Sequence, residues 1–528
     1  MNRRAALVLG GVTVACLAAA LGLWRATPRT DTRPNILIVL WDTVRADRLS
    51  LYGHTRDTTP FVDRFAQDAV VYDHAIASSE WTGPTHASLF TGLPLRTHGM
   101  DTYYKWLDHH HVTLAEQLAD AGYQTWAFTG NRFVSDFVNM LQGFETQLHT
   151  FEGPLKQPSR KATARKLLPR DRSTEISPAY TGGKQGWSKR LTLFKDAAPV
   201  ANRAFGRFLD QETDRPPWFA FINLMEAHQP RVPSLESRKA LLDDDQIELA
   251  LQTDSSLFSL MSFMSGKHAY TQAELAAMAG TYDASILDLD RAFQQMIEGM
   301  ERKGALDNTI VVLVSDHGEM LGEKGLYSHR WALYEPLVHV PLMIRYPERM
   351  VRQDPRLRAG RVSETVSIGQ VPATLLEAVD VDPMPGIAAS LLDGPPNGPV
   401  FTELRDPNIV MAVVRRAFPD VPKDQFARSL HAIYAGSDKL IRASDHRHEL
   451  YDLDADPTES DNRVEVEPAL RDRLLEQLAE WERTTPAYDP ALRQSTDKGS
   501  RRADPETQRM LEVLGYTDDE GEAGLEDD

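Results

Sequence analysis

The chain has 528 residues, of which 42% are hydrophobic and 25% charged, so it is long and apolar enough for a large globular core. Its formal net charge of −18 argues against nucleic-acid binding, which needs a basic surface. The single cysteine, Cys16, excludes an intramolecular disulfide and a zinc cluster built from cysteines.

The N-terminal segment, residues 1–24, predicts export from the cytoplasm. Arg3 and Arg4 precede an uncharged apolar run of about twenty residues that ends at Trp24, enough for a helix to cross ~30 Å of hydrocarbon. We interpret it as an uncleaved signal anchor. A cleaved signal peptide and lipidation at Cys16 are the alternatives. Each of the three places the rest of the chain in the periplasm or outside the cell.

After a polar linker over residues 25–33, strands alternate with helices. Capping boxes that begin at Thr113 and Thr271 open two of the helices, and Gly122 and Gly304 are suited to end them. Alternation of this kind predicts an α/β fold whose mostly parallel central sheet is covered by helices on both faces. Residues 35–40 form an apolar run without alternation, typical of a parallel strand buried on both faces. We expect further strands over residues 123–129, 218–224, 309–314 and 341–344.

The pattern divides the chain into a main domain and a smaller C-terminal unit. We expect the main domain over residues 34–397 and an α+β subdomain over residues 398–490, where the apolar pattern becomes looser. Pro468 opens a helix in this subdomain. The remaining residues, 491–528, form a polar and acidic tail.

Two segments have both a possible functional role and a simpler structural interpretation. Residues 154–190 are polar and rich in Lys and Arg, and we interpret them as a solvated insertion. A basic wall over an anionic substrate or lipid headgroup is the alternative. The run His109 to His111 lies just before a capped helix, and a solvated start of that helix is favoured over a metal site.

Polar side chains directly follow three of the predicted strands. Asp42 follows the first strand, Glu226 and His228 follow the third, and Asp316 and His317 follow the fourth. The carboxyl ends of parallel strands meet at one edge of a sheet, where ligands bind. Carboxylates and imidazoles that converge there suit a divalent cation.

Residues 81–92 predict the start of a helix with a hydroxyl at its tip. We expect Thr82 as the N-cap and Pro84 in the first turn. A helix N-terminus offers free N–H groups to a phosphate-like anion. A metal-bound hydroxyl at this point has a lowered pKa and is a nucleophile. A capped helix without chemistry is the alternative.

Five segments, in order, resemble the signature blocks of the sulfatase family of the alkaline phosphatase superfamily. The match runs over roughly residues 34–482 and implies the fold described above, with an active site that binds a divalent metal and an anionic ester. The segments are Pro34 to Asp47, Thr82 to Gly92, Asn223 to Pro230, Ser315 to Tyr346 and Glu449 to Asn462.

The resemblance implies roles for the matched residues. Asp42, Asp316 and His317 match metal ligands. Thr82 takes the nucleophile position, and its oxygen is also expected on the metal. His228 matches a histidine that contacts the anionic group of the substrate.

Three further positions carry weaker implications. His329 falls where the family places a basic residue over the anionic group or its leaving oxygen, and a structural histidine is the alternative. Lys324 stands where many relatives have histidine, so it either binds the anion or is a surface lysine. His86 stands where sulfatases have an arginine, and we expect it to contact substrate.

Departures from the family pattern decide the expected mechanism. Sulfatases begin this signature with Cys or Ser, which is converted to formylglycine, whereas Thr82 cannot form that aldehyde. No formylglycine is therefore expected. Thr43 replaces a frequent aspartate, which weakens a calcium-type site, although calcium, manganese and zinc all stay compatible with the ligands. Phosphodiesterase-like and phosphoglycerol- or phosphoethanolamine-transferring relatives use threonine as the nucleophile.

The sequence therefore predicts a metal-dependent hydrolase or transferase that acts on phosphate esters through Thr82. The substrate is an anionic ester, which can be a small molecule, a glycan or a lipid headgroup. A sulfuric ester hydrolase with unmodified threonine is one alternative. A catalytically inactive, membrane-tethered protein that binds anionic glycans is another.

Overall fold

The computed structural model describes residues 33–101, 104–151, 153–167, 197–211, 216–394, 398–405 and 426–492. The expected membrane helix and the acidic tail beyond Leu492 lie outside these residues. Within the described ranges, no helix combines the length and the apolar character that a membrane span requires.

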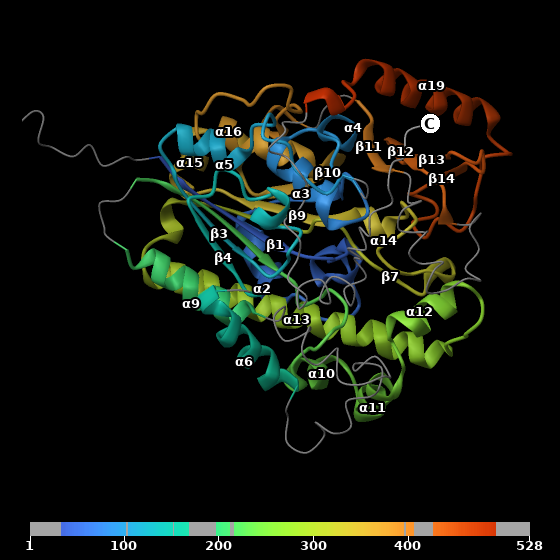
Figure 1. The fold of residues 1–528 in the computed structure, drawn as a ribbon, viewed down its shortest axis with the longest axis horizontal. Coiled ribbons are helices and arrows are strands. Elements are labelled where there is room, and N and C mark those ends of the chain that lie inside the picture. Colours follow the sequence, from blue (N-terminus) through green and yellow to red (C-terminus); the bar gives the residue numbers. More distant parts are fainter. Residues whose placement is uncertain are drawn as a thin grey trace, which may run out of the picture.

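An eight-stranded sheet forms the centre of the main domain (Figure 1). Its strand order is β10-β2-β9-β6-β1-β5-β3-β4, and β9 alone runs against its neighbours. The predicted mostly parallel sheet is therefore confirmed. Its strands are β1 (Asn35–Trp41), β2 (Val70–Ile76), β3 (Gln124–Thr129), β4 (Thr146–His149), β5 (Trp218–Leu224), β6 (Thr309–Val314), β9 (His339–Arg345) and β10 (Gly360–Ser367).

Helices cover both faces of this sheet, which explains why the central strands β1, β5 and β6 are mostly apolar without alternation. On β5, Phe221 packs edge-on against Phe90 of α3, while Trp218 packs against Phe205 of α9 on the opposite face. The helices on the α3 face include α5 and α16, and those on the other face include α2 and α13 (Figure 1). These six are α2 (Pro60–Phe65), α3 (Thr82–Thr91), α5 (Leu114–Asp120), α9 (Ala198–Leu209), α13 (Gln272–Arg302) and α16 (Val371–Ala378).

The predicted helix signals hold in the structure. Thr113 and Thr271 form complete capping boxes at the starts of α5 and α13, and Gly304 lies just beyond α13 with φ of 64°. Within the basic segment 154–190, the described part forms the helix α6. The other helices of the main domain are α4 (Leu95–His98), α6 (Lys156–Leu167), α10 (Leu235–Leu241), α11 (Asp244–Gln252), α12 (Leu257–Met264), α14 (Glu335–Val338) and α15 (Glu348–Gln353).

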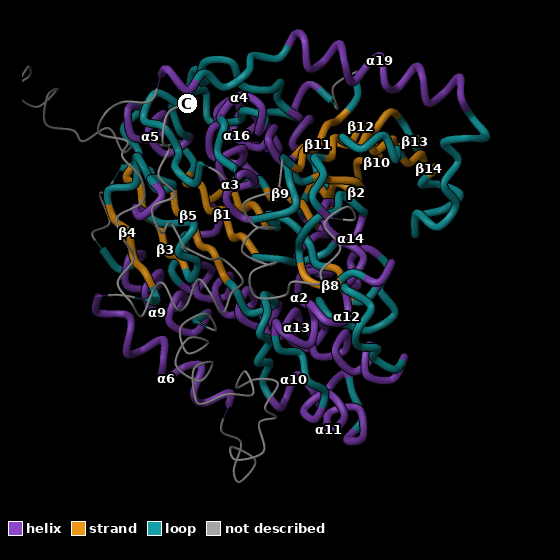
Figure 2. Tube along the Cα trace, turned by 45° about the vertical axis from the view of Figure 1, so that its right-hand side comes forward, coloured by secondary structure: helices purple, strands orange, loops and turns teal. Residues whose placement is uncertain are grey.

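The C-terminal unit is a small antiparallel sheet covered by one helix, α19 (Pro468–Thr484) (Figure 2). Leu474 and Leu478 of α19 pack with Ile433 and Leu440 in a core of their own. The predicted smaller α+β subdomain is thus confirmed. Its strands are β11 (Val400–Leu404), β12 (Leu430–Ala435), β13 (Asp438–Ala443) and β14 (Glu449–Asp452). A two-stranded ribbon, β7 (Met320–Leu321) and β8 (Tyr327–Ser328), follows β6.

Candidate active site

Four adjacent strands, β6, β1, β5 and β3, run parallel and bring polar side chains to the same edge of the sheet. Asp316 follows β6, Asp42 follows β1, and Asn131 follows β3, while Asn223 lies near the end of β5. All four side chains are buried. The parallel topology therefore builds one polar centre from segments that are far apart in the sequence.

Asp42, Asp316 and His317 form the centre of this cluster, with their ligand atoms all within 4.8 Å of one another. One oxygen of each carboxylate is held by the protein. Asp42 Oδ2 accepts from Asn131 Nδ2 at 2.9 Å, and Asp316 Oδ1 accepts from the backbone N–H of Thr43 at 3.1 Å. Among the described residues, Asp42 Oδ1 and Asp316 Oδ2 have no hydrogen-bond partner although they are buried. Such orphaned oxygens are what a cation site requires.

The electrostatics of the three residues also fit a divalent cation. Burial, and then repulsion from Asp316, raises the pKa of Asp42 to about 7. Burial likewise raises the pKa of Asp316 to about 7. Two such carboxylates need a nearby positive charge to remain ionised together. Burial lowers the pKa of His317, which favours the neutral imidazole that binds metals. The donor set thus fits a divalent metal ion.

The hydroxyl of Thr82 faces this centre. Its Oγ1 lies 3.3 Å from His317 Nε2 and 3.4 Å from Asn131 Nδ2. The prediction of Thr82 as N-cap is wrong by one residue, because Trp81 has the extended backbone of the N-cap and Thr82 is the first helical residue. The hydroxyl of Thr82 therefore does not cap α3, and it contacts the residues of the polar centre instead.

His329 lies next to His317, and His228 lies next to His329. The ring of His329 lies 4.7 Å from that of His317 and 5.0 Å from that of His228, between ring centroids. His329 Nδ1 is 3.4 Å from Glu319 Oε1, and Glu319 in turn pairs with Arg231. Burial lowers the pKa of His329 to about 4. His228 and His329 thus continue a row of neighbouring imidazoles that begins at His317, and their contact with substrate stays a prediction.

His86 and Lys324 lie in other surroundings. His86 is fully buried within α3, and its Nδ1 is 3.5 Å from Asp316 Oδ2, beside a carboxylate of the centre. Lys324 contacts the carbonyl of Glu459 and lies over the rings of Tyr334 and Tyr451 at 4.5 and 5.4 Å. These contacts join Lys324 to the C-terminal subdomain. Substrate binding by either residue remains a prediction.

Sequence reasoning missed the two asparagines and the pair formed by Arg231 and Glu319. Asn131 carried a usable signal, because it follows a predicted strand just as Asp42 and Asp316 do. No feature of the sequence marked Arg231, because its pairing with Glu319 depends on how distant segments pack.

Comparison with known proteins agrees with this geometry. The sequence profile described as Sulfatase matches residues 34–381. The N-acetylglucosamine-6-O-sulfatase of Bacteroides thetaiotaomicron is 24% identical over 497 residues, covering 85% of this chain and 86% of that protein. The arylsulfatase of Clostridium perfringens is 22% identical over 469 residues, covering 82% and 91%.

The fold has a clear counterpart among solved structures. The phosphonate monoester hydrolase of Agrobacterium radiobacter aligns with a TM-score of 0.65 and 23% identity, over 89% of this chain and all of that one (100%). The profile match covers well over half of the chain, and its range includes Asp42, Thr82, Asp316 and His317. This chain therefore belongs to the sulfatase family.

Proposed function

We propose that the chain is a metal-dependent hydrolase or transferase that cleaves phosphate or sulfate esters through Thr82 as an unmodified nucleophile. The position of the Thr82 hydroxyl carries the proposal. Thr82 is fully buried, and its Oγ1 lies 3.3 Å from His317 Nε2 and 3.4 Å from Asn131 Nδ2. An oxygen in this position is suited to bind the same metal ion as His317 and to act as a nucleophile.

The proposed reaction is an in-line displacement on the phosphorus or sulfur atom. The oxygen of Thr82 forms a bond to this atom as the bond to the leaving alcohol breaks, which gives an ester of Thr82. Water or an acceptor alcohol then displaces Thr82 and resolves the intermediate. Asp42, Asp316, His317 and Thr82 would hold the metal, which when bound supplies positive charge that acidifies the hydroxyl and stabilises the transferred group.

The neighbouring histidines supply hydrogen bonds and a proton. In this proposal His228 donates a hydrogen bond to the anionic group. His329 protonates the leaving oxygen. Its pKa of about 4 in the free protein leaves it neutral at pH 7, and the negative charge of a bound substrate raises that pKa. Glu319 accepts from His329 and so orients its ring.

Sulfate esters are the second candidate substrate, because both relatives described above are named sulfatases. Phosphate esters remain favoured on chemical grounds. Threonine cannot give the formylglycine that sulfatases use, whereas an unmodified hydroxyl suits transfer through a covalent phospho-intermediate. A phosphonate monoester also belongs among the test substrates, as the name of the structural neighbour suggests.

The test is a panel of aryl phosphate, phosphodiester, phosphonate and sulfate esters, assayed with the wild type and with two variants. We expect Thr82→Ala to lower kcat by on the order of 10³-fold or more, because the attacking atom is lost. Thr82→Ser keeps the hydroxyl and should retain part of the activity. Chelation should abolish turnover in the wild type, and added divalent metal should restore it.

Two results would contradict the proposal. Undiminished turnover by the alanine variant would reject Thr82 as nucleophile. Binding of sulfated or phosphorylated glycans by a wild type that turns over no ester would instead support the inactive binding protein.

We further propose that residues 1–24 export the chain and hold it at the outer face of a membrane. The apolar run after Arg3 and Arg4 supports this proposal. The full chain should stay in the membrane fraction after an alkaline carbonate wash, and a variant without residues 2–24 should stay in the cytoplasm. Recovery of the full chain from the cytoplasmic fraction would reject the proposal.

A further inference from the structure

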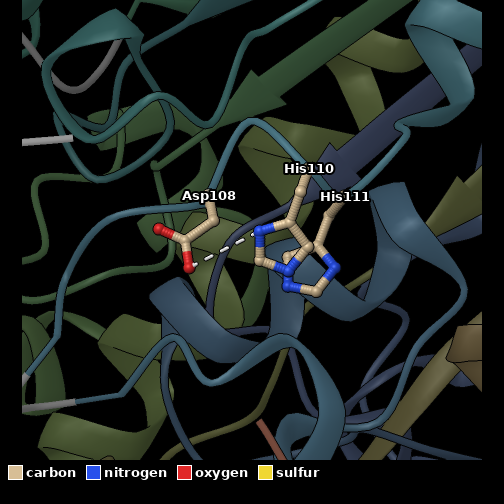
Figure 3. A group of neighbouring side chains, drawn as sticks. All are labelled: Asp108, His110 and His111. Carbon is tan, nitrogen blue, oxygen red and sulfur yellow. Dashed lines mark ion pairs between the residues drawn. The ribbon is translucent and has the colours of Figure 1, made fainter. Parts of the chain in front are cut away.

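A second group of possible metal ligands lies in the loop before α5. The side chains of Asp108, His110 and His111 converge there (Figure 3), with their ligand atoms all within 4.8 Å of one another. The two imidazole rings are 3.9 Å apart between centroids, and His110 Nδ1 lies 4.0 Å from Asp108 Oδ2. None of these residues belongs to the centre around Thr82.

His111 is a buried imidazole with an unused nitrogen. Its side chain is only 7% exposed, and Nε2 has no hydrogen-bond partner among the residues that the structure describes. A buried polar atom without a partner costs free energy unless a ligand occupies it. Burial, and then the neighbouring His110, lowers the pKa of His111 to about 4, so the ring is neutral at pH 7 and able to bind a metal. The predicted solvated start of a helix is therefore wrong for His111.

Hydrogen bonds from two tyrosines orient the carboxylate of Asp108, as neighbouring residues usually orient a metal-binding carboxylate. Its side chain is fully buried, and it accepts hydrogen bonds from the hydroxyls of Tyr488, at 2.6 Å, and of Tyr104. The two tyrosine rings stack on one another at 5.9 Å. Outer hydrogen bonds of this kind orient the ligands of metal sites. Tyr488 lies beyond α19, so the group sits where the end of the C-terminal subdomain meets the main domain.

An ion can reach this group from outside. His110 and His111 line a cavity of about 660 Å³ that lies between the main domain and residues 484–486. His110 is the more exposed of the two, so its ring can adjust around an ion. The ligand atoms of a tetrahedral zinc ion are about 3.3 Å apart. The ligand atoms of this group, which lie within 4.8 Å of one another, would therefore have to move closer together around the ion.

We propose that Asp108, His110 and His111 form a second cation site, for zinc or a similar divalent transition metal. One carboxylate and two imidazoles are ligands that such ions prefer, and the cavity leaves a coordination position open. Because Asp108 also binds Tyr488, a bound ion should stabilise the contact between the C-terminal segment and the main domain. The proposal does not depend on the role of Thr82.

The experiment uses the full chain in a D42N/D316N background, in which the candidate active site lacks two of its ligands. The protein is stripped with chelator, loaded with Zn²⁺ and desalted before its metal content is measured. We expect one equivalent of zinc in this background and none after the addition of His110→Ala. His109→Ala is the matched control, since it is the adjacent histidine outside the group, and it should keep the equivalent.

A second measurement distinguishes loss of the metal site from loss of the fold. Bound Co²⁺ should give visible d–d absorption that is lost in His110→Ala and in Asp108→Asn, while the circular dichroism of both variants stays unchanged. Zinc should also raise the melting temperature of the background variant but not that of its His110→Ala derivative. A background variant that retains no zinc, or a His110→Ala variant that retains as much as the control, would overturn the proposal.

Discussion

Asn131 contacts both Asp42, a candidate metal ligand, and Thr82, the candidate nucleophile. Its Nδ2 donates to Asp42 Oδ2 at 2.9 Å and lies 3.4 Å from the oxygen of Thr82. Its Oδ1 accepts from the backbone N–H of Phe133 at 2.9 Å, which fixes the orientation of the amide. Asn131 therefore contacts a candidate metal ligand and the candidate nucleophile together.

We expect Asn131→Ala to lower kcat/KM by about 10- to 100-fold, because an outer residue that orients a ligand typically has an effect of this size. The loss should appear together with weaker metal binding, measured by titration of the metal-free protein. Replacement of Asn308 serves as control, because this partly buried asparagine lies at the end of β6 opposite to Asp316. Unchanged kinetics and metal affinity in Asn131→Ala would refute this role.

The sequence was sufficient to predict the residues that follow strands, but not the contacts between their side chains. Asp42 and Asp316 were placed correctly because the end of a buried strand can be recognised in a single sequence. The Arg231–Glu319 pair could not be predicted, since it joins a loop after β5 to one after β6. The same holds for Lys324, whose partners lie in a subdomain that residue spacing does not position.

Among the elements, strand positions were easier to predict than strand directions. β5 and β6 have the predicted bounds, because an apolar run between polar residues marks both ends. β9 begins two residues before the predicted run and is antiparallel to both of its neighbours. A strand buried on both faces is apolar in either direction, so its pattern contains no information about direction.

The longest helix, α13, is fastened to the loop after β1 by a buried carboxylate. Asp283 lies 3.0 Å from Arg48 Nε and 2.6 Å from Arg56 Nη1, and its side chain is fully buried. Burial by itself would raise the pKa of Asp283, but the hydrogen bond from His54 and the charge of Arg48 outweigh it and lower the pKa. The ionised form therefore stabilises the fold.

We expect Asp283→Asn to lower the free energy of unfolding by about 3 kcal/mol at pH 7, because the variant leaves buried cations unpaired. The pKa of Asp283 is lower in the folded than in the unfolded chain, so its stabilisation is complete above about pH 4 and declines as the pH falls through the folded value. Denaturation midpoints of wild type and variant, measured from pH 7 to pH 3, should therefore converge at the acidic end. A difference that grows towards acid would contradict the assignment.

At the scale of the whole molecule, a buried ion cluster joins the two units. Lys439 of β13 is fully buried and binds Glu335 of α14 at 2.9 Å and Glu459 at 2.6 Å. Glu335 also accepts from the hydroxyl of Tyr434 at 2.7 Å, and its backbone N–H donates to Glu459. Two acids thus share one lysine at the junction, and the lysine offsets their mutual repulsion.

Lys439→Met keeps the length of the side chain but leaves two buried carboxylates without their cation. We expect it to lower the free energy of unfolding by about 3–5 kcal/mol, the usual cost of removing one partner from a buried ion pair. Arg442→Met is the matched control on the same strand. Arg442 pairs with Glu482 in partly exposed positions, with 28% and 19% of the side chains accessible, so its loss should cost less than about 1 kcal/mol.

Hydrogen exchange should locate the effect of Lys439→Met. If the cluster fastens the C-terminal subdomain to the main domain, amides of β11 to β14 and of α14 should lose protection before those of β1 and β6, which lie at the centre of the large sheet. Calorimetry should show an earlier first transition in Lys439→Met than in Arg442→Met. Equal midpoints for the two variants, or a loss of protection spread evenly over both sheets, would show that the cluster does not hold the two units together.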